Sequence, residues 1–308
     1  MKHMKNKNLS LKQALANYAI NYAGEKNVIV NPKDGGAYFC DFRNNIYQNK
    51  MEEKFIDMFL DGDGNELYSK AAAAHSSSML GFNFFHWINE THPIVIQFGD
   101  DIKKYNNVVF EEKLTVLKGT KPSNMDIILS NSEGDILFIE SKFLEYQKKD
   151  TFDISETYKK DPKNRYLTRR DFWMNFIEQY DATQRKQYWS GIKQDICHMI
   201  AIINWIDGET EVLGRKYSGN DVRFVNLVFS PNNELFKKEA SDFYSYKKLY
   251  EQLRSKFDHS GKIPPRLKYQ FMSYSEIWPF ITNVIDPELK SYLIKHYMTF
   301  ANPTYLPK

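Results

Sequence analysis

Hydrophobic and polar positions are patterned most clearly between residues 125 and 143, where they predict two β-strands joined by a tight turn. Residues 125–129 and 135–139 are runs of apolar and β-branched side chains. Between them, residues 131–134 have the composition of a turn, and Gly134 can adopt a positive φ. We therefore expect a β-hairpin in the middle of the chain, around which the other elements are organised.

The rest of the pattern predicts a fold in which helices and strands are mixed. Besides the hairpin, strands are expected over residues 93–98, 108–117 and 222–229. Helices are expected after Ser10 and over residues 48–60, 66–74, 76–88, 170–180, 182–206, 233–257, 275–285 and 287–300, whereas residues 27–45 read as a loop. The inner side of helix 182–206 should carry Ile192, Ile196, Met199, Ile200 and Ile203.

This order of elements indicates the fold class. The hairpin, helix 182–206 and strand 222–229 would form a strand–helix–strand unit. We therefore predict an α/β (α+β) fold with a central mixed sheet of about four to five strands, flanked by helices and extended by extra helices at both ends.

Composition narrows the class of protein. The chain has 308 residues, of which 42% are hydrophobic and 26% charged, as in globular proteins. Because the net charge is only +3, any basic surface for nucleic acid must be local. Cys40 and Cys197 are far apart, so a disulfide framework is not indicated and a reducing cytoplasm is expected. No apolar run suggests a signal peptide or a membrane span, so we expect no membrane association.

Three charged residues interrupt the apolar hairpin: Asp126, Glu140 and Lys142. Residues two apart on a strand share a face, so Glu140 and Lys142 project together, and Asp126 on the partner strand could lie beside Glu140. Charges on buried strands are costly unless they pair or bind a metal. The pattern therefore predicts a divalent-cation site with a lysine beside it; the alternative is a surface salt bridge at a fraying strand end.

At these residues the chain resembles the PD-(D/E)XK nuclease superfamily, whose core hairpin carries an Asp on one strand and Glu-x-Lys on the next. Met125 stands where the motif name has proline. Upstream, Glu66-Leu67 and the segment that begins His75-Ser76-Ser77 resemble a group of bacterial restriction endonucleases, in which a Glu-Leu pair and a Ser-Ser-led helix precede the catalytic hairpin. The resemblance covers residues 60–205.

The resemblance implies a Mg²⁺-dependent endodeoxyribonuclease of the type II restriction kind, in which Mn²⁺ substitutes for Mg²⁺. Asp126 and Glu140, with the Ile139 or Ser141 backbone nearby, would hold the metal. Lys142 would orient or deprotonate the attacking water. Glu66 would join as a third carboxylate; the alternative is a helix-start residue that interacts with the helix dipole.

Helix 182–206 carries further candidates. Lys193 and Gln194 occupy the position where related cores carry an auxiliary polar residue, although an exposed polar face would explain them equally well. His198 lies in an apolar stretch, which favours a hydrogen-bonded core histidine.

A polar segment follows the hairpin. Its candidate DNA-contacting residues are Lys148, Lys149, Arg165, Arg169 and Arg170. The alternative for this charge run is a solvated loop.

We divide the chain into a helical N-terminal elaboration (1–60), a nuclease core (61–230) and a mostly helical C-terminal elaboration (231–308), which could also form one continuous domain. The expected partners are double-stranded DNA and a DNA methyltransferase encoded nearby, and a homodimer is left open. Two other functions remain open: a repair or recombination nuclease of the same fold, and a non-catalytic DNA-binding module.

Overall fold

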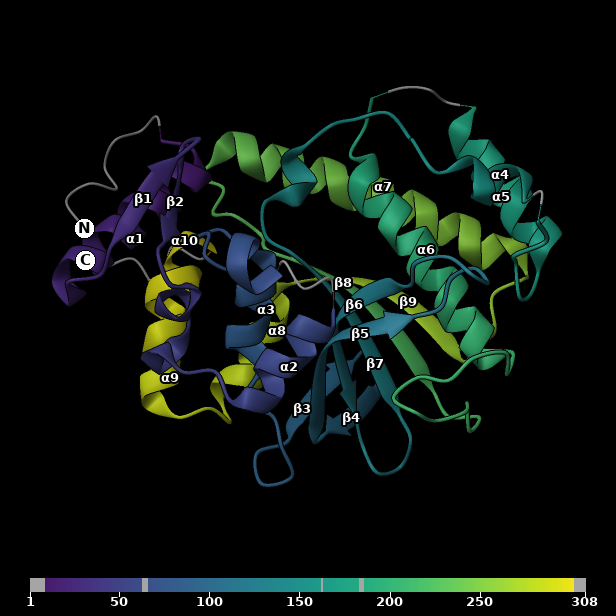
Figure 1. Ribbon diagram of the computed structural model, residues 1–308, viewed down its shortest axis with the longest axis horizontal. Helices are drawn as coiled ribbons and strands as arrows, with labels where there is room; N and C mark the ends of the chain where they lie inside the picture. The colour runs from purple at the N-terminus through teal and green to yellow at the C-terminus, as the bar shows by residue number, and fades with distance from the viewer. Residues whose placement is uncertain (1–8, 63–65, 162, 183–185, 302–308) are drawn as a thin grey trace.

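A central five-stranded sheet forms the middle of the molecule in the computed structural model, which describes residues 9–62, 66–161, 163–182 and 186–301 (Figure 1). The strand order is β5-β6-β7-β8-β9. These strands are β5 (Asn107–Leu114), β6 (Ser123–Ser130), β7 (Ile136–Lys142), β8 (Val222–Val228) and β9 (Leu267–Ser273).

The sheet is mixed. The β5–β6 and β6–β7 pairs are antiparallel, whereas β7–β8 and β8–β9 are parallel. Helix α6 (Trp189–Ile206) connects β7 to β8, and α7 (Lys237–Ser260) connects β8 to β9. The predicted hairpin, the strand–helix–strand unit and the mixed sheet are thus confirmed.

Helices cover both faces of the sheet, so every residue of β7 and β8 is buried. Alternate residues of a strand point to opposite faces. Leu137 and Ile139 accordingly belong to a core cluster with α2, α3 and α8, whereas Ile136 and Phe138 belong to a second cluster with α5, α6 and α7. The inner face of α6 is fully buried at the five predicted positions, Ile192, Ile196, Met199, Ile200 and Ile203.

The other described α-helices either pack on the sheet, as α2, α3, α5 and α8 do, or lie further out (Figure 1). They are α1 (Leu11–Lys26), α2 (Glu53–Asp61), α3 (Ser77–Phe85), α4 (Glu156–Lys160), α5 (Arg170–Asp181), α8 (Tyr274–Thr282), α9 (Pro287–Leu293) and α10 (Thr299–Ala301), with π-helices at Glu66–Lys70 and Ile294–Met298. The N-terminal and C-terminal helices pack together, because the Tyr18 ring lies 5.0 Å from His296 and 6.0 Å from Phe300. Among the described helices, none combines the length and apolar character needed to cross a membrane.

Several predicted elements differ from the structure because of pairing between distant residues. The expected loop 27–45 contains a hairpin, β1 (Val30–Lys33) and β2 (Gly36–Phe39), whose turn uses positive φ at Asp34 and Gly35. The expected helix 66–74 is a π-helix only as far as Lys70, because the alanine-rich part that follows bonds to β2 instead. Tertiary pairing there overrides the helix propensity of alanine.

Two strand predictions were wrong: the sheet to which residues 94–98 belong, and the absence of a strand from the C-terminal tail. Residues Ile94–Phe98 do form a strand, β3, but it pairs with β4 (Asp101–Tyr105) in a separate two-stranded sheet. Gly99, in the turn between β3 and β4, has a positive φ of 64°, and the turn lets the two strands pair with each other. In the tail predicted as mostly helical, β9 completes the central sheet.

The division of the chain into an N-terminal elaboration, a core and a C-terminal elaboration stays a prediction.

Candidate active site

The structure brings Asp126 and Glu140 to one position of the β6–β7 ladder. Ile127 and Ile139 are the last paired residues at this end, and Asp126 and Glu140 follow directly. There the backbone N–H of Ser141 donates to Asp126 Oδ2 at 2.7 Å. The carboxylate of Asp126 thus bonds the neighbouring strand where the regular ladder stops, which fixes it beside Glu140.

Glu140 is fully buried, and both of its carboxylate oxygens have partners. Lys142 Nζ donates to Oε1, and His198 Nε2 lies 2.8 Å from Oε2. Lys142 Nζ also donates to Gln194 Oε1 at 2.7 Å, while His198 Nδ1 lies 3.3 Å from Ser123 Oγ. His198 is therefore a hydrogen-bonded core histidine, as its apolar helix suggests, and its partner is a candidate catalytic carboxylate.

The two auxiliary candidates on α6, Lys193 and Gln194, have different partners in the structure. Gln194 contacts the candidate catalytic lysine directly. Lys193 instead interacts electrostatically with Cys197, one turn further along the helix.

The pKa values of Asp126, Glu140 and Lys142 are shifted in different ways. Burial and the neighbouring Glu140 raise the pKa of Asp126 well above its usual value. Burial alone would raise the pKa of Glu140, but the Lys142 ammonium and His198 outweigh it and hold that pKa below its usual value. Burial alone would lower the pKa of Lys142, but Glu140 and Asp126 outweigh it and raise that pKa. The site thus holds a lysine cation (Lys142), an ionised carboxylate (Glu140) and a second carboxyl group (Asp126) whose raised pKa disfavours ionisation.

The donor chemistry of this pair fits a hard divalent cation. Asp126 is partly exposed, so an ion can reach it from solvent. A bound cation would also relieve the repulsion between the two carboxylates, which raises the pKa of Asp126. Across the described ranges, no three His, Cys, Asp or Glu side chains form a metal-binding group. Among the described residues, Asp126 and Glu140 are the two carboxylates that meet at this position.

Sequence reasoning missed Glu111. It lies on β5 between the pairs Phe110–Ile127 and Glu112–Met125, which places it level with Asp126. Its φ is 56°, an uncommon conformation for a non-glycine residue within a strand, and its side chain is buried. Its charge also raises the pKa of Asp126. The signal that could have identified it was a pair of acidic residues, Glu111 and Glu112, in the middle of a predicted strand.

A buried polar network lies next to β7, between α6, β8 and β9, and was also missed. Asn226, the β8 partner of Glu140, donates to both oxygens of Asp195 at 2.9 and 2.8 Å. Tyr269 OH donates to Asp195 Oδ2 at 2.6 Å. Burial raises the pKa of Asp195 to about 7, although Tyr269 and Asn226 lower it in part. The signal for this network was an acidic residue in an apolar helix and an amide in an apolar strand.

Helix α3 supports the same strand from the other face. Ser76 caps the helix, since its Oγ accepts from Met79 N at 3.3 Å. Ser141 Oγ donates to the carbonyl of Ser77 at 3.1 Å and lies 2.7 Å from Tyr274 OH. The Ser-led helix therefore abuts the candidate active site. The backbone of Glu66 starts a π-helix, but its side chain lies outside the described residues, so its catalytic role stays a prediction.

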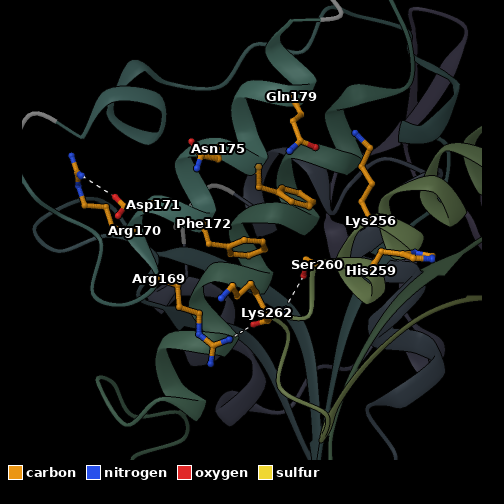
Figure 2. Close-up of a pocket in the computed structure, with 11 residues that line it drawn as sticks. Arg169, Arg170, Asp171, Phe172, Asn175, Gln179, Lys256, His259, Ser260 and Lys262 are labelled. Carbon is orange, nitrogen blue, oxygen red and sulfur yellow. Dashed lines mark hydrogen bonds and ion pairs between the residues drawn. The ribbon is translucent and has the colours of Figure 1, made fainter.

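The predicted DNA-contacting residues are distributed over separate surfaces. Arg169 forms a two-bonded ion pair with Asp207, at 2.8 and 2.7 Å, and also donates to the carbonyl of Lys262. Arg170 pairs with Asp161 and Asp171 at 3.0 and 3.3 Å. Both arginines line a cavity of about 960 Å³ between α5 and the end of α7 (Figure 2).

The other members of that set lie elsewhere. Lys149 lies over the ring of Tyr188, 4.9 Å from its centroid, and the backbone N–H of Arg165 bonds Asp161 at 2.6 Å. Lys148 lines a different cavity, which also includes Ser77 and Leu144 near the end of β7. DNA contact by each of these residues stays a prediction.

An Asp on one hairpin strand, Glu-x-Lys on the next and a parallel strand beyond a crossover helix define the core of a restriction-endonuclease-like nuclease. The chain belongs to the family described as Restriction Endonuclease associating with ARP (REase-ARP), whose model matches residues 12–298. Membership in a restriction endonuclease family indicates a nuclease-type function. No curated protein and no solved structure matches the chain.

Proposed function

We propose that this protein is a Mg²⁺-dependent endodeoxyribonuclease that hydrolyses phosphodiester bonds of double-stranded DNA, as a type II-like restriction endonuclease does. The observation that carries the proposal is the cluster of Asp126, Glu140 and Lys142 at one end of the β6–β7 hairpin. Family membership supports it, because carboxylates that hold a metal ion and a nearby cation are suited to phosphodiester hydrolysis by a restriction endonuclease.

Asp126 and Glu140 would hold the Mg²⁺, and Mn²⁺ would substitute for it because both ions accept oxygen ligands. When bound, such an ion polarises the phosphate and lowers the pKa of a water. The assignment explains why a partly exposed carboxyl with a raised pKa is retained beside a second carboxylate.

Lys142 would act as a fixed positive charge beside the scissile phosphate. Glu140 and Gln194 hold its ammonium group in place, and its raised pKa keeps it protonated. A protonated lysine donates hydrogen bonds to a water or phosphate oxygen and stabilises the negative charge that grows in the transition state. Of the two roles expected for Lys142, orientation therefore has more support than proton abstraction.

His198 and Gln194 would be positioning residues. His198 fixes one oxygen of Glu140 and Gln194 fixes the ammonium of Lys142, each by one hydrogen bond. Locked side chains of this kind keep a catalytic arrangement close to its reactive geometry.

The test is cleavage of plasmid and phage DNA with Mg²⁺, followed by gel electrophoresis. We expect discrete bands from the wild-type protein and a loss of on the order of a hundredfold or more in Glu140→Gln. Glu133→Gln is the matched control, because Glu133 is an exposed residue of the same hairpin. Near-normal cleavage by folded Glu140→Gln would show that the mechanism is wrong.

The same experiment separates the alternatives. Smeared products would favour a repair or recombination nuclease with this chemistry. Intact DNA that is nevertheless bound would favour a non-catalytic DNA-binding module. A DNA methyltransferase encoded nearby that protects the DNA from cleavage would support the restriction assignment, and sedimentation would test a homodimer.

A further inference from the structure

We propose that the cavity beside the N-terminus of α3 binds a backbone phosphate of the same DNA strand, next to the phosphate that is cut. This inference rests on the proposed function. The cavity, of about 540 Å³, is called the α3 pocket; the lining residues used below are Lys12, Lys70, Ser77, Leu144, Gln147 and Lys148.

The pocket adjoins the candidate active site. Leu144, two residues after Lys142, lines it. Ser77 lines it as well, and its carbonyl accepts the hydrogen bond from Ser141 Oγ at 3.1 Å. The pocket lies on the α3 side of β7, whereas the side chain of Lys142 faces α6. A DNA strand that crosses the end of β7 would therefore place one phosphate at Lys142 and a neighbouring phosphate at this pocket.

Positive charge converges on the pocket from three separate parts of the chain. Lys12 comes from α1, Lys70 from the π-helix and Lys148 from the loop after the catalytic strand. Lys12 Nζ donates to the carbonyl oxygen of Asp34 at 2.9 Å, which leaves its charge without a carboxylate partner in the described chain. Lys148 likewise forms no ion pair with any described residue. Cations without acidic partners attract an anion.

The acidic residue of the pocket is already engaged. Glu145 Oε2 accepts the backbone N–H groups of Phe143 and Leu144 at 2.7 and 3.0 Å, which shapes the loop. The polar side chain of Gln147 also lines the pocket. The positive end of the α3 dipole adds to the attraction for an anion. Donors and positive charge thus prevail in the pocket.

The walls of the pocket are held by backbone pairing. Phe39 N donates to Ala72 O and Ala74 N donates to Ala37 O, both at 2.9 Å, so the β1–β2 hairpin is bonded to the segment that precedes α3. The N-terminal elaboration would thereby contribute directly to substrate binding.

The experiment compares two charge-matched double variants of the full-length protein. Lys12→Gln/Lys148→Gln removes two pocket charges. Lys216→Gln/Lys268→Gln removes two exposed charges, one in the loop before β8 and one at the start of β9. Duplex affinity is measured by fluorescence anisotropy against salt, with each double in a Glu140→Gln background that prevents cleavage. We expect the pocket double to flatten the log–log salt slope by about one for each phosphate that the pocket no longer neutralises, and the control double to leave it unchanged.

A modified substrate locates the contact. In proteins with Glu140 intact, a neutral methylphosphonate next to the scissile phosphate should slow cleavage by the wild type and have little further effect on the pocket double. Equal salt slopes for the two doubles, with wild-type cleavage intact, would overturn the inference and leave the proposed function standing. Absence of DNA binding and cleavage by the wild type would overturn both.

Free phosphate is the other source of this ligand chemistry. Titration with inorganic phosphate separates the two sources. If the wild type binds inorganic phosphate, the pocket double does not, and the DNA salt slope is the same for both, then the pocket binds a free phosphate group and the DNA contact is rejected.

Discussion

Replacement of Asp195 by Asn should remove a pH dependence from the stability of the protein. Asp195 is fully buried, and burial raises its pKa from 3.8 to about 7. Because the pKa is higher in the folded state than in the unfolded chain, the folded protein binds the extra proton between these two values. The free energy of unfolding is therefore largest at low pH and falls as pH rises toward 7, by about 1.4 kcal/mol per pH unit.

Between pH 5 and pH 8 this linkage amounts to about 2–3 kcal/mol. The amide of the Asp195→Asn variant would be neutral throughout, so the variant should gain that amount relative to the wild type as pH rises. The side chain also fits the site: an amide N–H could satisfy Asn226 Oδ1, which is buried without a partner in the described part of the chain. The charged and titratable groups that interact with Asp195 include Glu140, Lys142, Cys197, Tyr246, Tyr250 and Tyr269. These groups titrate in the wild type and in the variant alike, so their contribution cancels when the two stabilities are subtracted.

Urea unfolding at several pH values between 5 and 8 measures the effect. The matched control is Asp57→Asn, because Asp57 is exposed on α2 and should keep the wild-type pH dependence. Parallel curves for wild type and Asp195→Asn would refute the reasoning, because they would mean that Asp195 is ionised in the folded protein throughout this range.

The site and its surroundings support three further predictions. Glu66→Gln should raise the Mg²⁺ concentration needed for half-maximal cleavage if Glu66 is a ligand; unchanged metal titration would make it a helix-start residue only. His198→Ala should lower kcat more than it raises KM and should also destabilise the fold by about 1–3 kcal/mol, because a buried carboxylate oxygen of Glu140 loses its donor; unchanged kcat would remove His198 from the positioning role. Arg169→Gln should lower the free energy of unfolding by about 1–3 kcal/mol, because its ion pair with Asp207 is largely shielded from water; an unchanged midpoint with a flattened DNA salt slope would instead favour a role in phosphate binding.

Local patterns were sufficient to predict the middle of the molecule. The alternation in residues 125–143 located the hairpin, and the spacing of Glu140 and Lys142 placed both on one face, where Asp126 joins them. The inner face of α6 follows from the same kind of periodicity, because its five predicted core positions are all fully buried.

Elements that depend on distant partners were not predictable in this way. β9 was overlooked although its first five residues, Leu-Lys-Tyr-Gln-Phe, alternate apolar and polar side chains as a half-buried strand does. Its place in the central sheet follows only from its parallel pairing with β8. Glu111 lies level with Asp126 only through the β5–β6 register, and Asp195 meets Asn226 only after α6 packs on the sheet. Propensity describes a segment alone, whereas these arrangements are properties of pairs of segments.

Ser141 links substrate contact to the geometry of the carboxylates. Its backbone N–H holds Asp126, and its hydroxyl bonds both the first turn of α3 and Tyr274 at the start of α8. A displacement of α3 by a bound strand would therefore reach Asp126 through a single residue. Binding at the helix and metal binding at the carboxylates are thus expected to be thermodynamically coupled, so that the factor by which bound DNA changes the metal affinity equals the factor by which bound metal changes the DNA affinity.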